Sequence, residues 1–285
     1  MSDMKYLIIT ADDYGMCQSV NRATDACMSE GIVTSTNVMT NMDFAHEAKK
    51  LRSEFPNVSV GVHFTLTAGK SVLPAEKVSS LLESDGTFHS YKRFRELYKQ
   101  GKIKNEEILA EITAQYEKFL DICGKPDYWN THQNVHVAFG LFDLFSKKAM
   151  EFGIDKMRSH QRIYVKPSGK STMTLKWRIL NPIKTVIINH WQNNQNSHNM
   201  KSTQGLIVCL NSDDRLNSKY MFANISWDGK SFGELVVHPA DDVDCVYFGQ
   251  ITDKRIKEYK QFTDKNLKNI LKENNIELIN FDRIV

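Results

Sequence analysis

The stretch YLIITADD, residues 6–13, decides the fold, because it is an apolar run that ends on two adjacent carboxylates. Three further short apolar runs also end on side chains that can bind a metal ion or move a proton: VSVGVH at 58–63, YWNTH at 128–132 and LVVH at 235–238. Strands buried on both faces of a parallel sheet have near-continuous apolar sequences. The C-terminal ends of such strands carry the chemistry of α/β barrels and open α/β sheets. The sequence therefore predicts an α/β fold with one site assembled at the strand ends.

Helical patterns separate these apolar runs. Residues 18–30 and 105–122 carry apolar side chains at helical spacing, and Gly31 follows the first of them as a C-cap glycine does. Strands that alternate with helices form βαβ units, which pair in parallel with right-handed crossovers. About seven such units in 285 residues favour a TIM-like (β/α) barrel over an open sheet.

We interpret residues 1–285 as a single domain, because a chain of this length suits one large α/β unit. Residues 165–232 interrupt the alternation of strands and helices, and they are rich in Asn, Ser, Lys and Gln. We therefore predict that residues 165–232 form an insertion or cap on this domain.

The composition is that of an ordinary globular protein, with 41% apolar residues, 25% charged residues and a formal net charge of +3. The charges are scattered, and a cluster such as residues 254–260 mixes both signs, which is typical of a solvated helix face and not of a nucleic-acid surface. The five cysteines are widely spaced and include no CxxC pair, which argues against a disulfide framework and against a thiolate zinc site.

The N-terminus enters a strand almost directly, without a basic and apolar leader, and no apolar run approaches the ~20 residues that span a bilayer. We therefore expect a cytoplasmic protein with neither nucleic-acid nor membrane partners. A homodimer is expected from the general frequency of such assemblies.

The residues at the strand ends include a candidate metal site made of Asp13, His63 and His132. Catalytic sites for divalent metals such as zinc use about three nitrogen or oxygen ligands and leave one position open. Asp12 beside Asp13 supports this interpretation, because two adjacent carboxylates on an apolar strand repel each other and are costly to bury without a cation. A helix cap would explain only Asp13, and a lone His63 would more often be a hydrogen-bonded structural residue.

Three more residues are candidates for the same site. His136 follows His132 by four residues, a spacing that puts two side chains on one face of a helix but does not make them converge at a strand exit. His238 ends the last apolar run before Pro239, and an imidazole there suits general acid catalysis. Arg158 is a candidate substrate-binding residue, because its planar guanidinium can orient a carboxylate, although a surface arginine is the ordinary alternative. The other histidines receive no role: His46, His89, His160, His190 and His198.

Five motifs together resemble those of the YdjC-like carbohydrate deacetylases, which are similar to enzymes that remove acetyl groups from chitooligosaccharides. In chain order the motifs are ADDYG at 11–15, GIVTST at 31–36, GVHFTLT at 61–67, THQNVH at 131–136 and VHPA at 237–240. The resemblance implies a distorted (β/α) barrel and one divalent metal ion, Mg or Zn, with Asp13, His63 and His132 at the ligand positions. It places Asp12 at the general base, His238 at an acid or ligand-supporting position, and His136 at a site histidine.

The third motif departs from the family pattern. Many relatives carry an acidic residue and a run of histidines there, whereas this chain has Asn130, Gln133 and Asn134 around the retained His132. Groups that orient a ligating imidazole tune its basicity, so these changes bear on substrate preference and activity more than on the ligand itself.

From these features we expect a metal-dependent hydrolase that removes acetyl groups from an N-acetylated mono- or oligosaccharide. Three alternatives remain open on the sequence. Two histidines and one carboxylate also describe non-haem iron oxygenases. A sugar isomerase or lyase can use a similar barrel. Finally, the altered third motif is compatible with a sugar-binding protein whose catalysis has decayed.

Overall fold

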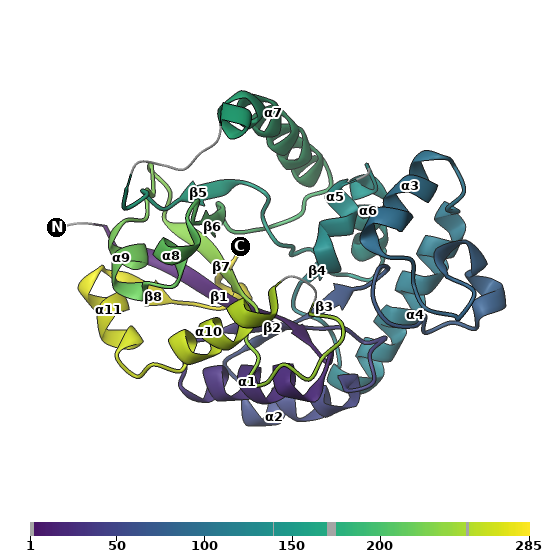
Figure 1. The fold of residues 1–285 in the computed structure, drawn as a ribbon, viewed down its shortest axis with the longest axis horizontal. Coiled ribbons are helices and arrows are strands. Elements are labelled where there is room, and N and C mark those ends of the chain that lie inside the picture. Colours follow the sequence, from purple (N-terminus) through teal and green to yellow (C-terminus); the bar gives the residue numbers. More distant parts are fainter. Residues whose placement is uncertain (1–2, 139, 170–174, 249–250) are drawn as a thin grey trace.

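The computed structural model describes residues 3–138, 140–169, 175–248 and 251–285. Its centre is one parallel sheet, in which seven strands follow the order β4-β3-β2-β1-β7-β6-β5 and β8 pairs with β1 off this path (Figure 1). The strands are β1 (Lys5–Tyr14), β2 (Ser35–Val38), β3 (Ser59–Phe64), β4 (Trp129–Thr131), β5 (Arg162–Tyr164), β6 (Leu206–Val208), β7 (Phe232–Val237) and β8 (Ile276–Leu278).

The two ends of this sheet approach each other through short bridges. Trp129 of β4 pairs in parallel with Met157, and Lys156 pairs in parallel with Lys201. Met157 and Lys201 precede β5 and β6, so the segments that enter these two strands connect β4 to the far end of the sheet. The predicted distorted barrel of about seven strands is therefore confirmed, with its thinnest pairing between β4 and β5.

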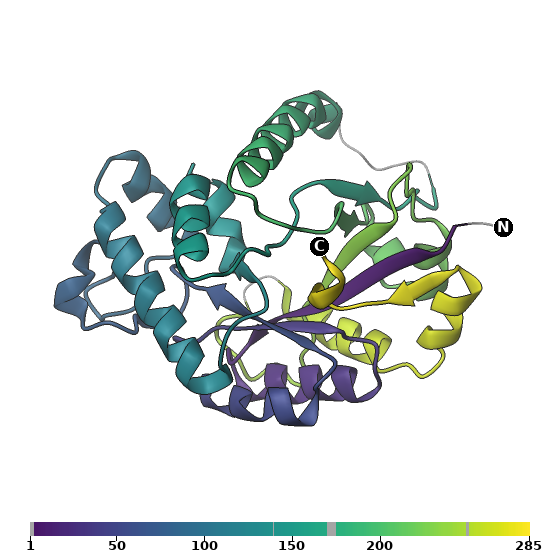
Figure 2. The ribbon, with the colours of Figure 1, turned by 180° about the vertical axis from the view of Figure 1, so that it is seen from behind.

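The helices lie outside the sheet, with α1 and α2 along one side and α10 and α11 at the end near β8, as Figure 1 and the reverse view in Figure 2 show. They are α1 (Gln18–Ser29), α2 (Leu51–Glu54), α3 (Tyr91–Lys99), α4 (Asn105–Cys123), α5 (Val135–Ala138), α6 (Phe142–Glu151), α7 (Leu175–Ser197), α8 (Ser212–Arg215), α9 (Ser218–Ala223), α10 (Thr252–Phe262) and α11 (Leu267–Glu273). The helices predicted over 18–30 and 105–122 are thus confirmed as α1 and α4. Within the described residues, none of the helices has the length and apolarity needed to cross a bilayer.

Residues 165–232, which we predicted to be an insertion or cap, include a strand of the barrel. Because β6 pairs with both β5 and β7, the stretch is not an insertion along its whole length. The part that leaves the barrel is α7, which lies beside α6 in Figure 1.

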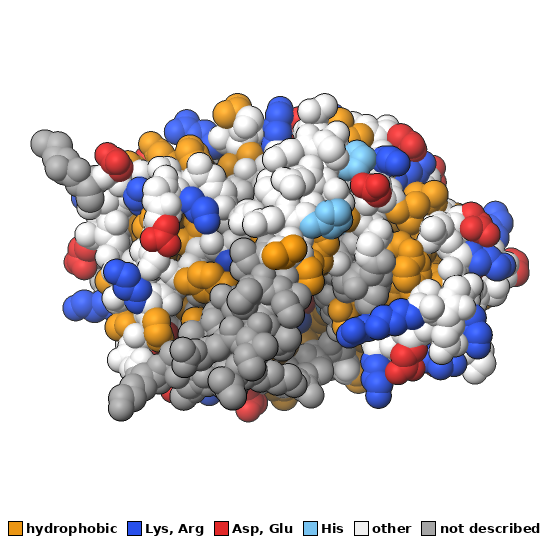
Figure 3. Space-filling model, turned by 90° about the horizontal axis from the view of Figure 1, so that it is seen from above, with side chains coloured by type: hydrophobic (Ala, Val, Ile, Leu, Met, Phe, Trp, Pro, Cys, Tyr) orange, Lys and Arg blue, Asp and Glu red, His pale blue; other side chains and the backbone are white. Residues whose placement is uncertain are grey.

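On the face seen from above in Figure 3, basic and acidic side chains are interspersed. The single-domain organisation, with a cap narrowed to α7, stays a prediction.

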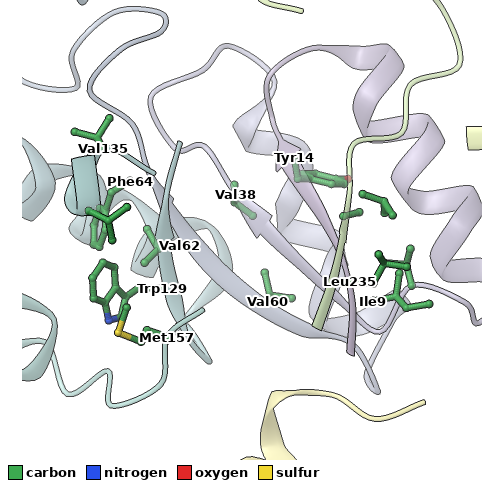
Figure 4. Close-up of a cluster of buried hydrophobic side chains, with 14 of the residues drawn as sticks. Ile9, Tyr14, Val38, Val60, Val62, Phe64, Trp129, Val135, Met157 and Leu235 are labelled. Carbon is green, nitrogen blue, oxygen red and sulfur yellow. The ribbon is translucent and has the colours of Figure 1, made fainter. Parts of the chain in front are cut away.

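Side chains alternate between the two faces of each strand, so the outer face of the sheet is apolar and the inner face carries an apolar cluster around Ile8 and Tyr128 as well as polar side chains. Ile9 of β1 belongs to the apolar layer between the sheet and the helices. Its neighbour Thr10 points the other way and donates to Glu234 Oε1 at 2.9 Å, and Asp12 accepts hydrogen bonds from Arg158 on the same inner side. Figure 4 shows side chains of the apolar layer, among them Ile9, Val38, Val60, Val62 and Leu235.

A glycine in β3 makes room for the aromatic ring of Tyr128 on the inner face. A Cβ atom at Gly61 would lie only 2.6 Å from the ring of Tyr128. The hydroxyl of Tyr128 donates to the Thr36 carbonyl at 3.1 Å and accepts from Ser35 Oγ at 2.8 Å. The same ring stacks on Phe281, with 3.8 Å between the ring centroids. Gly61 therefore lets Tyr128 tie β2, β3 and the C-terminal segment together.

We expect Gly61→Ala to lower the free energy of unfolding by about 1–3 kcal/mol, because the new methyl group forces the Tyr128 ring out of its packed position. Gly169→Ala is the matched control, since a Cβ atom there meets nothing within 4 Å. Urea denaturation of both variants measures the difference. Equal stability of Gly61→Ala and Gly169→Ala would contradict the packing argument.

Candidate metal centre

The strand ends bring most of the predicted site residues to one cavity of about 650 Å³. Asp12 and Asp13 lie near the end of β1, His63 lies near the end of β3, and His132 follows β4 directly. His238 follows β7, and Arg158 lies between the bridge at Met157 and β5. All six side chains line this cavity: Asp12, Asp13, His63, His132, Arg158 and His238.

Asp13, His63 and His132 form a group with the spacing of metal ligands. Asp13 Oδ1 lies 3.3 Å from His63 Nε2 and 3.0 Å from His132 Nδ1, and the three side chains offer ligand atoms that all lie within 4.8 Å of one another. A tetrahedral ion with bonds of about 2.1 Å holds its ligand atoms about 3.4 Å apart. The spacing of the three ligand atoms therefore fits a divalent ion. In the part of the chain that the structure describes, no other set of three such residues has this spacing.

An irregularity at the end of β1 lets two adjacent carboxylates face the same cavity. In a regular strand, neighbouring side chains point to opposite faces. Here the pairing of β1 with β2 shifts register between Ala11 and Tyr14, and Asp13 has a φ of +75°. The backbone N–H of Asp13 donates to Asn37 Oδ1 at 3.3 Å, which helps to hold this left-handed conformation. The bulge therefore turns Asp13 toward the two histidines while Asp12 stays on the inner face.

Asp12 is buried and ionised. Its carboxylate accepts two hydrogen bonds from Arg158, Nη1 to Oδ2 at 2.7 Å and Nη2 to Oδ1 at 2.6 Å, and Oδ1 accepts a third from Asn37 Nδ2 at 2.6 Å. Burial by itself raises the pKa of Asp12, but the Arg158 guanidinium outweighs it and the pKa falls to about 2. Asp12 is therefore a fixed anion beside the group that could hold a metal ion.

Arg158, predicted as a substrate-binding residue, pairs with carboxylates of the protein itself. Besides Asp12, its Nε donates to Glu234 Oε1 at 3.0 Å, and only 4% of the residue is exposed. Burial raises the pKa of Glu234, although the Arg158 charge opposes this shift. Arg158 thus orients Asp12 through two hydrogen bonds. Its direct contact with a substrate stays a prediction.

His238 lines the cavity next to Asp12. Its Nε2 lies 3.9 Å from Asp12 Oδ2, and its side chain is 28% exposed. Its backbone N–H donates to Glu258 Oε2 at 2.7 Å, which anchors the residue to α10. Burial is the main cause that lowers the pKa of His238 to about 4, so the imidazole is neutral near pH 7.

His136 does not line the cavity, although we predicted a catalytic role for it. It is fully buried, with Nδ1 2.6 Å from Thr131 Oγ1 and Nε2 2.9 Å from His160 Nε2. Its ring packs edge-on against Trp129. Burial and the facing His160 both lower the pKa of His136. The structure therefore places His136 behind the wall of the cavity, with His160, to which the sequence had assigned no role, as its partner.

The sequence interpretation also missed two buried residues of α10. Arg255 Nη2 donates to Asp13 Oδ2 at 2.5 Å, and Glu258 holds both the His238 backbone and Arg215, whose Nε lies 2.6 Å from Glu258 Oε1. The cluster 254–260 was predicted to be a solvated helix face, which is wrong for these two side chains. Their spacing of three residues, on the same helix face as Phe262, was an available signal for burial.

Comparisons with known proteins agree with this architecture. The model of the family described as YdjC-like protein matches residues 6–273. A carbohydrate deacetylase of Clostridium beijerinckii is 29% identical over 98% of this chain and 99% of its own, and one of Thermoanaerobacter pseudethanolicus is 27% identical over 98% of both chains. A chitooligosaccharide deacetylase of Yersinia enterocolitica is 31% identical over 59% of this chain and 66% of its own.

A solved structure has the same fold. The crystal structure of an Enterococcus faecalis protein described as a cellobiose-phosphate cleavage protein matches with a TM-score of 0.74 and 23% sequence identity, and the match covers 98% of both chains. At this identity the likeness supports the distorted barrel and carries no conclusion about activity.

The lowered pKa of Asp12 predicts a pH dependence of stability in metal-free protein. Because the folded-state pKa is about 2 and the ordinary value is 3.8, the ionised carboxylate stabilises the fold fully above pH ~4, and this contribution of about 2 kcal/mol is lost as the pH falls toward 2. Asp12→Asn lacks it. We therefore expect the stability advantage of wild type over Asp12→Asn to shrink by about 2 kcal/mol between pH ~5 and ~2. Urea denaturation with a chelator present measures both proteins, and parallel pH profiles would contradict the assignment.

Proposed function

The chain belongs to the YdjC-like protein family, and from this membership and its cavity we propose that it is a metal-dependent carbohydrate deacetylase, which hydrolyses the amide bond of an N-acetylated sugar. The observation that carries the proposal is the convergence of Asp13, His63 and His132 beside a second, ionised carboxylate, Asp12. The names of the relatives add the substrate class, an acetylated carbohydrate. The cavity volume of about 650 Å³ lies within the usual range for small-molecule sites.

Asp13, His63 and His132 are the residues that would hold the metal ion. We proposed Mg or Zn, and a donor set with two imidazole nitrogens and one carboxylate oxygen favours zinc. When bound, a divalent ion supplies Lewis acidity toward the acetyl carbonyl oxygen and lowers the pKa of a water molecule. Arg255 holds the other carboxylate oxygen of Asp13, so Oδ1 remains directed at the two histidines.

Asp12 is the base in this proposal. Its oxygen Oδ1 accepts from both Asn37 and Arg158, whereas Oδ2 accepts a single hydrogen bond from the described residues, donated by Arg158. Oδ2 therefore keeps a lone pair for the proton of the water molecule that attacks the acetyl carbon. The low pKa keeps Asp12 deprotonated at neutral pH, and its three hydrogen bonds fix its orientation before the reaction begins.

His238 delivers the proton to the leaving group. It lines the cavity on the Oδ2 side of Asp12, and as a neutral imidazole it can accept the proton that Asp12 has taken and pass it to the amine nitrogen of the sugar. The C–N bond of the amide breaks, a C–O bond forms, and the products are acetate and the free amino sugar. We assign this transfer to His238 and not to His136, which lies behind the cavity wall.

The remaining expectations concern location and assembly. We propose that the acetylated mono- or oligosaccharide is the partner of this cavity, and a cytoplasmic location and a homodimer stay predictions. The non-hydrolytic alternatives are distinguished by their products. An isomerase or lyase yields no free acetate, and a non-haem iron oxygenase consumes oxygen.

We expect acetate release from N,N′-diacetylchitobiose by protein supplied with Zn²⁺, Mg²⁺ or Co²⁺, and loss of that release when the metal is chelated, because the amide carbonyl then lacks its electrophilic partner. A coupled acetate assay measures the rate. Acetate release that continues at an unchanged rate in chelator would contradict the metal dependence. Sugar turnover without acetate would contradict the deacetylase proposal.

Replacing each of the two adjacent carboxylates should affect metal binding and kcat differently. Asp12→Asn is expected to keep metal binding and to lower kcat by about 10²–10⁴-fold, because it removes the base. Asp13→Ala is expected to lose the metal, because it removes a ligand. Titration calorimetry with Zn²⁺ and the acetate assay separate the two effects. Asp85→Asn is the control, because Asp85 is not among the residues that line the cavity. Near wild-type turnover by Asp12→Asn would overturn the base assignment.

A further inference from the structure

We propose that Asn130 sets the tautomer of His63 and thereby weakens metal binding at the Asp13, His63 and His132 group. The inference rests on the metal site of the proposed function and goes beyond it, because it names the residue that limits metal affinity in this chain. Asn130 of β4 pairs in register with His63 of β3, and its side chain is fully buried. Its amide therefore has no access to solvent and can form hydrogen bonds only with the protein groups around it.

The two ends of the amide face groups of different hydrogen-bonding character. One end lies 2.5 Å from His63 Nδ1. The other end lies 3.0 Å from Asn37 Nδ2, 3.1 Å from Arg158 Nη1 and 3.0 Å from Arg158 Nη2. A guanidinium has only donors, and the amide nitrogen of Asn37 also donates. The amide oxygen of Asn130 therefore belongs at this second end, which leaves its NH₂ group against His63 Nδ1.

This orientation decides which nitrogen of His63 carries the hydrogen. A neutral imidazole has one N–H donor and one acceptor nitrogen. When Asn130 Nδ2 donates to His63 Nδ1, the hydrogen must lie on Nε2. His63 Nε2 lies 3.3 Å from Asp13 Oδ1, so this hydrogen occupies the side of the ring that faces the candidate metal position. In this arrangement both ends of the Asn130 amide meet groups of the opposite hydrogen-bonding kind.

Metal binding requires the other tautomer. To act as a ligand, His63 Nε2 must present its lone pair, and the hydrogen then lies on Nδ1 and needs an acceptor. Asn130 can accept it only by turning its amide oxygen toward His63. That movement brings its NH₂ group against Asn37 Nδ2 and both terminal nitrogens of Arg158, so that donors face donors at a fully buried position. The conflict opposes metal binding.

A carboxylate at position 130 removes the conflict. Aspartate has nearly the same shape as asparagine, and both of its oxygens accept hydrogen bonds. One oxygen can accept from His63 Nδ1–H while the other accepts from Asn37 and Arg158. We expect Asn130→Asp to bind Zn²⁺ about 10- to 100-fold more tightly than wild type, which is the usual effect of a partner that orients a ligating imidazole.

Asn134→Asp is the matched control, because it adds the same charge to the wall of the same cavity without replacing the partner of His63. Titration calorimetry with Zn²⁺ compares the three proteins at one neutral pH. The ¹⁵N chemical shifts of His63 in metal-free protein report its tautomer directly. Wild type should have the hydrogen on Nε2 and Asn130→Asp on Nδ1. The wild-type measurement needs no variant, so the test survives if Asn130→Asp does not fold.

A gain in Zn²⁺ affinity confined to Asn130→Asp, together with the change of tautomer, supports the inference. A wild-type His63 with its hydrogen on Nδ1 overturns it, and so does an equal gain in Asn134→Asp, because charge alone would then explain the affinity. If all three proteins bind Zn²⁺ with these affinities but release no acetate, the proposed function fails and the inference stands. If none of them binds Zn²⁺, both are overturned.

Discussion

One buried guanidinium holds the inner face of the barrel together. Arg158 donates to Asp12 with both terminal nitrogens and to Glu234 with Nε, so it links β1 and β7 from a segment that enters β5. Two carboxylates inside a barrel would be costly to bury without this charge. Among the described residues β4 joins the far side of the sheet through the bridge between Trp129 and Met157, and Arg158 follows Met157 directly in the chain.

A second arginine does the same for the other carboxylate. Arg255 reaches Asp13 from α10, and the bulge at the end of β1 turns Asp13 away from Asp12. Two adjacent acids are thus held by separate cations and given separate environments. Asp13 keeps one oxygen for His63 and His132, and Asp12 keeps one oxygen toward His238. The separate roles that we propose for Asp13 as a ligand and Asp12 as a base follow from this separation and not from any difference between the two side chains.

The polar inner layer is shared between support and chemistry. Asn37 donates to Asp12 and accepts from the Asp13 backbone, and Asn130 stands between His63 and the Arg158 nitrogens. A change in any one of these groups therefore alters the donors and acceptors available to the others. Through this coupling the amide of Asn130 faces both His63 and the guanidinium that holds Asp12. The effect that we propose for Asn130 concerns His63, because Asp12 keeps its own hydrogen bonds from Arg158 and Asn37.

The sequence by itself determined the parallel barrel and the residues at its strand ends. Apolar runs, helical spacing and the pair Asp12 and Asp13 are local patterns, and parallel strands deliver their ends to the same edge whatever the details of packing. Only the tertiary structure decided which of these residues meet. Arg158 was a candidate for substrate binding and proved to pair with Asp12, Arg255 was not singled out, and His136 shares a motif with His132 but faces His160 behind the cavity. Such pairings join residues as many as 242 positions apart, so they depend on how the helices and strands pack and leave no periodic signal in the chain.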